Sequence, residues 1–146
     1  MRRRITTLLA LVPAMVISLA PAGSAGTTGQ FTVPLSGDQV VPVAGDLDGG
    51  GGVFVAMGRK TGTFCFFADT ANISPALTSV ELHRGERGQV GVVVAALHGS
   101  STDPDVSGCL TFDRELVQDI ERRRAAYYID IHNDEFPGGA LRAQLG

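Results

Sequence analysis

Short stretches in which apolar and polar residues alternate run through the chain beyond its first 25 residues. In Gln30–Leu35, Phe31, Val33 and Leu35 share one face, as expected of a strand with one side in a core. Similar strand patterns follow at Gly52–Met57, Thr61–Ala68, Thr78–His83, Val90–Leu97, Cys109–Phe112, Ala126–His132 and Ala140–Leu145. Val40–Ala44 is expected to be extended around Pro42, and Asp46–Gly51 to be a flexible loop. Turn residues separate the strands, which favours antiparallel connections.

One segment has a helical pattern instead. Asp113 is a residue type that caps helices, and Leu116, Val117 and Ile120 follow it as a narrow apolar stripe. The pattern predicts a single helix at about 114–124. The fold class predicted is therefore all-β: an antiparallel β-sandwich or Greek-key-like barrel of about eight short strands with one short helix.

The first 25 residues have a different composition from the rest. Arg2–Arg4 give a positive start, Ile5–Ala20 is apolar, and Ala22–Ala25 is a run of small residues. This order is typical of a secretory signal peptide, here residues 1–25, cleaved near Ala25. The alternative is a retained membrane anchor, although the apolar run contains Pro13 and is shorter than the ~20 residues that a spanning helix needs.

Removal of the signal leaves residues 26–146 as a single β domain, long enough for one core. The whole chain has 12 basic and 15 acidic residues; the signal contains three arginines and no acid, so nine basic residues and a formal charge of −6 remain. An acidic domain without a basic stripe argues against nucleic-acid binding. The expected location is extracellular, or the cell surface if the anchor is retained, and the expected partner is an unidentified extracellular protein or small ligand.

The sequence has two cysteines, Cys65 and Cys109, each in a strand-like stretch. An even number of cysteines in an exported chain favours a disulfide, so we expect a Cys65–Cys109 bond rather than two buried free thiols. A C-x-x-C redox motif is absent from the sequence.

Two predicted strands carry the residues with the clearest chemical potential. In Val80–His83 and Tyr128–His132, a period of two places the apolar residues on one face and polar residues on the other. Each strand has an acid two residues before a histidine on its polar face. These four residues are Glu81, His83, Asp130 and His132.

If the two strands are neighbours, these side chains converge on one patch. Three interpretations remain open: structural hydrogen bonds that hold the turns Arg84–Gly88 and Phe136–Gly139, a ligand or divalent-metal site, and catalysis. The expected binding patch consists of these four residues and Arg84. The candidate metal ligands are the four residues without Arg84. No G-x-S-x-G motif supports nucleophilic catalysis. His98 stands apart and is expected to be solvated.

At these same strands the chain resembles the CHRD domain, a module named from the secreted growth-factor antagonist chordin and found singly in bacterial exported proteins. The resemblance is carried by FTVPLSGDQVVP at Phe31–Pro42, VELHRG and GQVG within Val80–Gly91, YYIDIH at Tyr127–His132, and FPGGALRAQL at Phe136–Leu145. The family's corresponding motifs are L-S-G-x-x-E-V-P, A-H-I-H-x-G-x-x-G-x-N-G, Y-V-N-V-H and x-P-x-G-E-I-R-G-Q-L.

Two positions depart from those motifs. Glu81 stands where the family usually has a histidine, and Asp130 where it usually has an asparagine. These acids would suit a cation better than an anion. The resemblance implies an extracellular β domain and no particular reaction.

The leading functional interpretation is a secreted, non-enzymatic binding or structural module with its recognition patch on the two histidine-bearing strands. The alternative is a mononuclear metal-binding protein or metal-dependent enzyme that uses Glu81, His83, Asp130 and His132. Three histidines in the chain limit it to one such ion.

Overall fold

The computed structural model describes residues 29–73 and 76–146, so the predicted signal peptide lies outside the described residues. The described part contains eight strands and one α-helix, as predicted. The strands are β1 (Gln30–Ser36), β2 (Gly50–Gly58), β3 (Thr63–Ala71), β4 (Leu77–Arg84), β5 (Val92–His98), β6 (Val106–Thr111), β7 (Tyr127–Asn133) and β8 (Leu141–Gln144), and the helix is α1 (Arg114–Arg122).

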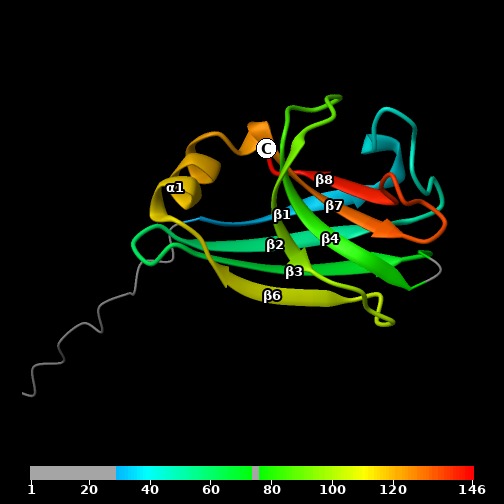
Figure 1. Ribbon diagram of the computed structural model, residues 1–146, viewed down its shortest axis with the longest axis horizontal. Helices are drawn as coiled ribbons and strands as arrows, with labels where there is room; N and C mark the ends of the chain where they lie inside the picture. Colours follow the sequence, from blue (N-terminus) through cyan, green and yellow to red (C-terminus); the bar gives the residue numbers. More distant parts are fainter. Residues whose placement is uncertain (1–28, 74–75) are drawn as a thin grey trace, which may run out of the picture.

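The eight strands form one antiparallel sheet in the order β5-β4-β7-β8-β1-β2-β3-β6. The sheet curls into a nearly closed, barrel-like shape with α1 at one end (Figure 1). The predicted all-β class is therefore confirmed, in its barrel-like form. Strands β4, β7 and β8 are direct neighbours although β4 and β7 are far apart in the sequence.

Alternation along the strands builds the core. Val53, Val55 and Met57 of β2 point inward, whereas Phe54 between them is partly exposed. The helix contributes Val117 and Ile120, both fully buried, so its predicted apolar stripe is confirmed. No helix among residues 29–73 and 76–146 is long and apolar enough to cross a membrane.

Two local expectations were wrong and a third holds only in position. Val40–Ala44 was expected to be extended, but it follows a 3-10 turn at Gly37–Gln39 and bends at residues 41–43, where the Val41–Pro42 peptide bond is cis. The end of the expected loop Asp46–Gly51 belongs to β2, because Gly50 and Gly51 pair with Ala71 and Thr70 of β3. Asp113 is the N-cap residue of α1, as expected, but its side chain makes no capping hydrogen bond.

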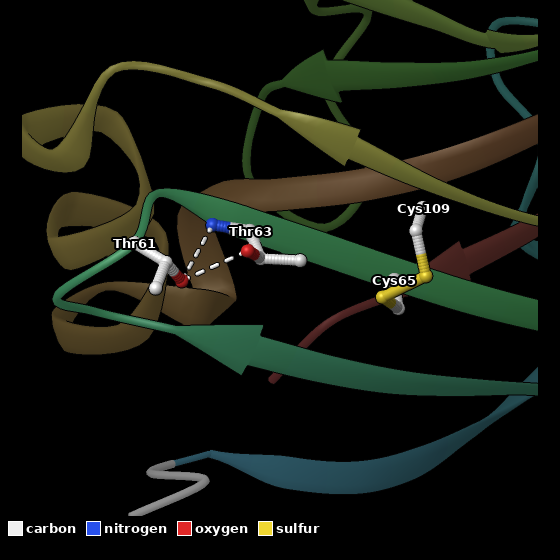
Figure 2. Close-up of a disulfide and its surroundings, with 4 residues drawn as sticks. All are labelled: Thr61, Thr63, Cys65 and Cys109. Atoms are coloured by element: carbon white, nitrogen blue, oxygen red, sulfur yellow. Dashed lines mark hydrogen bonds between the residues drawn. A yellow bond between two sulfur atoms is a disulfide. The ribbon is translucent and has the colours of Figure 1, made fainter.

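The Cys65–Cys109 disulfide is confirmed. The two residues lie directly opposite each other on β3 and β6, and their sulfur atoms are 2.07 Å apart (Figure 2). At the nearby end of β3, the Thr63 amide donates a hydrogen bond to Oγ1 of Thr61, and the two hydroxyl oxygens are 2.8 Å apart (Figure 2). The bond therefore ties the edge strand β6 to its neighbour, in a part of the sheet remote from β4 and β7 in strand order.

Candidate functional site

The polar faces of β4, β7 and β8 form one continuous patch. Glu81 lies opposite Asp130 across β4 and β7, and Asp130 lies opposite Arg142 across β7 and β8. Their apolar neighbours along each strand point into the core. The residues of this face are Glu81, His83, Tyr128, Asp130, His132, Arg142 and Gln144. The prediction that the two histidine-bearing strands are adjacent is therefore correct.

One half of this patch is fully engaged in holding a loop. Arg142, only 1% exposed, donates hydrogen bonds to the carbonyl oxygens of Gln89 (2.8 Å) and Glu86 (2.9 Å) and to Oε1 of Gln144 (2.8 Å). Gln144 in turn donates to the Gly85 carbonyl oxygen at 3.0 Å. These contacts fasten residues 85–91 over the sheet, so this half of the patch has a structural role.

Tyr128 connects that half to the histidines. Its ring stacks on His83 with centroids 4.7 Å apart, and the Arg142 guanidinium carbon lies 3.4 Å from the Tyr128 ring centroid. Its hydroxyl accepts a hydrogen bond from the Gly91 amide at 3.1 Å. Gly91 is required here, because a Cβ at that position would lie 2.3 Å from the Arg84 carbonyl oxygen. The His83 ring is thus supported by a side chain that is itself held in place.

The other half brings together Glu81, His83 and His132. Nε2 of His83 lies 3.2 Å from Oε2 of Glu81, and Nε2 of His132 lies 3.8 Å from the same oxygen. One candidate ligand atom from each of the three residues lies within 4.8 Å of the other two. These three residues are therefore the ones placed to hold a metal ion together.

Several polar atoms in this half are buried with at most an ion-pair contact. Nδ1 of His83 and Oδ1 of Asp130 have no hydrogen-bond partner, and Nε2 of His83 and of His132 faces only the Glu81 carboxylate, at 3.2 Å and 3.8 Å. In the described part of the chain, the one other such atom is Oε2 of Glu121, which instead makes an ion pair with Arg59 at 2.8 Å. Because buried polar groups are normally hydrogen-bonded, their concentration at one place calls for an explanation.

Burial also changes the protonation of these groups. Desolvation lowers the pKa of His83, and the nearby His132 acts in the same direction while Glu81 opposes it. Desolvation raises the pKa of Asp130 to about 6, against the opposing effect of His132 and Arg142. His83 is therefore neutral near pH 7, which is the form that accepts a proton or a cation.

Asp130 is near this group but not within it. Its carboxylate faces Gly139, where a Cβ would lie 3.0 Å from Oδ1, and Gly139 has a φ of +122°. Gly139 also lines an apolar groove of about 350 Å³ between residues 42–44 and residues 135–139. Asp130 thus lies between the three-residue group and this groove.

The structure does not bring Arg84 into the group. Its side chain is exposed and its guanidinium carbon lies 6.0 Å from the ring of Tyr127. His98 is half-buried rather than fully solvated, at the end of β5, with Nδ1 2.9 Å from the Gly99 carbonyl oxygen.

Sequence reasoning did not single out Arg142 and Gln144. The signal was present: in Leu141–Leu145 they alternate with apolar residues and so face the same side of the sheet as Asp130. One of the three interpretations had the polar patch holding the turns Arg84–Gly88 and Phe136–Gly139. Arg142 and Gln144, rather than the histidines, hold the first turn, whereas Nδ1 of His132 lies 3.2 Å from the Pro137 carbonyl oxygen in the second.

Comparison with protein families gives one match, in which the model of the CHRD domain aligns with residues 31–145. Comparisons with curated proteins and with solved structures gave no match. The family model covers nearly all of the described chain, including both histidine-bearing strands and β8. The chain therefore belongs to the CHRD domain family.

Proposed function

We propose that this protein is an exported, non-enzymatic binding module whose ligand site is formed by Glu81, His83, Asp130 and His132 on the polar face of β4 and β7. The observation that carries the proposal is the contrast between the two halves of that face. Arg142 and Gln144 have their hydrogen bonds met by the protein, whereas Nδ1 of His83 and Oδ1 of Asp130 have no hydrogen-bond partner and Nε2 of both histidines faces the single carboxylate of Glu81. Unmet buried polar groups cost stability, and proteins retain such groups at sites where a ligand completes them.

The proposal is for binding rather than for nucleophilic catalysis. Among residues 29–73 and 76–146, neither His83 nor His132 makes a hydrogen bond to a serine hydroxyl or a cysteine thiol, and both cysteines are in the disulfide. Nucleophilic catalysis by serine or cysteine relies on such a pair.

Three observations support export. The N-terminal pattern is that of a signal peptide, the two cysteines form a disulfide, and the CHRD domain is an extracellular-type domain. Protein recovered from the culture medium of an expressing bacterium should have an intact mass that corresponds to a chain beginning just after Ala25.

The test compares the two halves of the patch by mutation, using protein treated with a chelator. We expect Glu81→Gln and His132→Gln each to change the free energy of unfolding in urea by less than about 1 kcal/mol, because glutamine can still accept from Ser79 at position 81 and donate to the Pro137 carbonyl at position 132. Arg142→Met should cost about 3 kcal/mol or more, because it removes three hydrogen bonds, one of them to the buried Oε1 of Gln144, from a residue that is only 1% exposed.

The opposite result would contradict the proposal. If Glu81→Gln and His132→Gln destabilise the protein as much as Arg142→Met does, the four residues are a structural network like the rest of the face.

A further inference from the structure

We infer that the ligand of this site is a single divalent transition-metal ion of the zinc type, held by Glu81, His83 and His132. The inference rests on the proposed function, since it names the ligand of the same patch. It also narrows the ligand set from four residues to three, because Asp130 has no oxygen within the group of donor atoms formed by the other three and its carboxylate faces Gly139.

The spacing of the donor atoms fits such an ion. Tetrahedral zinc with bonds of about 2.0–2.1 Å keeps its donors roughly 3.3 Å apart. Oε2 of Glu81 is 3.2 Å from Nε2 of His83 and 3.8 Å from Nε2 of His132, and all three donor atoms lie within 4.8 Å of one another, so side-chain rotation has to bring the donors together to close the site. Two imidazoles and one carboxylate are a donor set that zinc and copper(II) favour, whereas calcium and magnesium prefer oxygen ligands.

The hydrogen bonding of His132 points its free nitrogen toward the site. Nδ1 of His132 lies 3.2 Å from the Pro137 carbonyl oxygen, which is only an acceptor, so Nδ1 carries the proton. Nε2 then has its lone pair free, on the side where Glu81 lies, and it is buried without a hydrogen-bond partner. A backbone carbonyl that orients the far nitrogen of a histidine is a common outer contact of protein metal sites.

His83 is held in position from the other side. Tyr128 stacks on its ring, and Tyr128 is fixed by Arg142 and by the Gly91 amide. A ligand whose orientation is set before the ion arrives loses less conformational entropy on binding. The loop over residues 85–91, which Arg142 also fastens, thus supports the site without contributing a ligand.

Three protein ligands leave a tetrahedral ion with one further position, for water or for a donor atom from a partner. The carboxylate of Asp130 is the nearest remaining polar group of the patch with a buried, unpartnered oxygen. It adds negative charge near the ion without completing its coordination.

The experiment is isothermal titration of zinc chloride into the chelator-treated, full-length exported protein. We expect one ion per chain, and at least tenfold weaker binding in each of the variants Glu81→Gln, His83→Gln and His132→Gln. His98→Gln and Glu115→Gln are matched controls that lie outside the site and should bind within about twofold of the parent protein. Calcium chloride should give no comparable heat.

Cobalt(II) gives a second readout on the unmutated protein, which does not depend on the variants folding. A four-coordinate site with nitrogen and oxygen donors should produce the intense visible bands of tetrahedral cobalt. Weak octahedral bands, or no bands, would overturn the inference.

The other outcomes separate the inference from the proposed function. If zinc does not bind while Glu81→Gln and His132→Gln remain as stable as the parent protein, the inferred metal ligand is refuted and the proposed binding site stands. If zinc does not bind and those variants lose stability, both are wrong. Zinc binding that the three variants leave unchanged would place the ion elsewhere and overturn the inference.

Discussion

Arg142 and His83 are both almost completely buried polar residues on the same face of one sheet, but they differ in what surrounds them. Every hydrogen bond of Arg142 ends on a carbonyl or amide oxygen of the protein, whereas Nδ1 of His83 has no hydrogen-bond partner and its Nε2 faces only the Glu81 carboxylate, at 3.2 Å. The first arrangement stabilises the fold, and the second costs stability unless something else binds. This difference between individual residues is the basis of the proposed function.

Much of the site was predictable at this scale. Alternation alone placed Glu81 and His83 on the polar face of one strand, and Asp130 and His132 on the polar face of another. Their convergence required the two strands to be neighbours, which the structure confirms. The separation of Asp130 from the other three was not predictable, because it depends on the close approach of Gly139, a residue of the following turn. The burial of Arg142 was not predictable either, because the loop that covers it is distant in sequence.

Asp119 gives a prediction for the pH dependence of stability. Two hydrogen bonds from Arg123, and one from the Tyr127 hydroxyl at 2.6 Å, lower the pKa of Asp119 to about 2 from an ordinary value of 3.8. A depressed pKa in the folded state means that the ionised form stabilises the fold above the ordinary value, and that this contribution is lost as the pH falls toward 2. We expect Asp119→Asn to be less stable than the parent protein at pH 7, with a difference that shrinks below about pH 4.

Urea unfolding at a series of pH values measures this difference. Asp113→Asn, on the residue that precedes the same helix and makes no capping hydrogen bond, is the control and should differ from the parent by no more than about 0.5 kcal/mol. An Asp119→Asn difference that stays constant down to pH 2 would show that the ionisation of Asp119 does not stabilise the fold.

At the scale of whole elements, the sequence predicted all eight strands and the helix, because each has a clear period. The ends of β2 and β5 differ from those expected, since pairing with a neighbour, rather than local pattern, decides where a strand begins. Val40–Ala44 has an extended pattern in sequence, but it follows the 3-10 turn Gly37–Gln39, bends at residues 41–43 and is not part of the sheet.

The disulfide belongs to this scale because it joins two elements. Cys65 and Cys109 are 44 residues apart, and closing a loop of that length stabilises a domain by about 4 kcal/mol on the chain-entropy account. We expect the double variant Cys65→Ser/Cys109→Ser to lose most of that amount, measured by urea unfolding, and to keep the zinc affinity of the parent, because β3 and β6 contribute no residue to the site.

Two results would contradict this prediction. A thiol titration of the denatured parent protein that finds two free sulfhydryls would show that Cys65 and Cys109 do not form a disulfide. A loss of zinc affinity in the double variant, with the fold intact by circular dichroism, would show that the disulfide and the site are coupled.

At the scale of the whole molecule, the strand order is what creates the site. β4 and β7 are separated in the sequence by β5, β6 and α1, yet they pair along most of their length, and β8 continues the same face. After β5, β6 and α1 the chain returns to lie beside β4 as β7. The acid-histidine pair of β7, Asp130 and His132, therefore lies next to the pair of β4, Glu81 and His83. The match to the CHRD family model spans residues 31–145 and so includes all of these strands.

The disulfide and the family together are compatible with a protein that works outside the cell, where the N-terminal pattern would direct it. An acidic domain with the cation site proposed above is suited to binding in that setting. Its partner, on this account, meets the ion at the position that the three protein ligands leave open.

The central claim is that His83 and His132 are ligand-binding groups rather than parts of a structural network. Long-range proton–nitrogen NMR of the histidine rings tests this most directly, recorded on the chelator-treated protein before and after one equivalent of zinc. We predict that His132 is protonated on Nδ1 before zinc is added, and that one nitrogen each of His83 and His132 then shifts while His98 does not. Unchanged signals from His83 and His132, or a shift confined to His98, would contradict zinc binding by these two histidines.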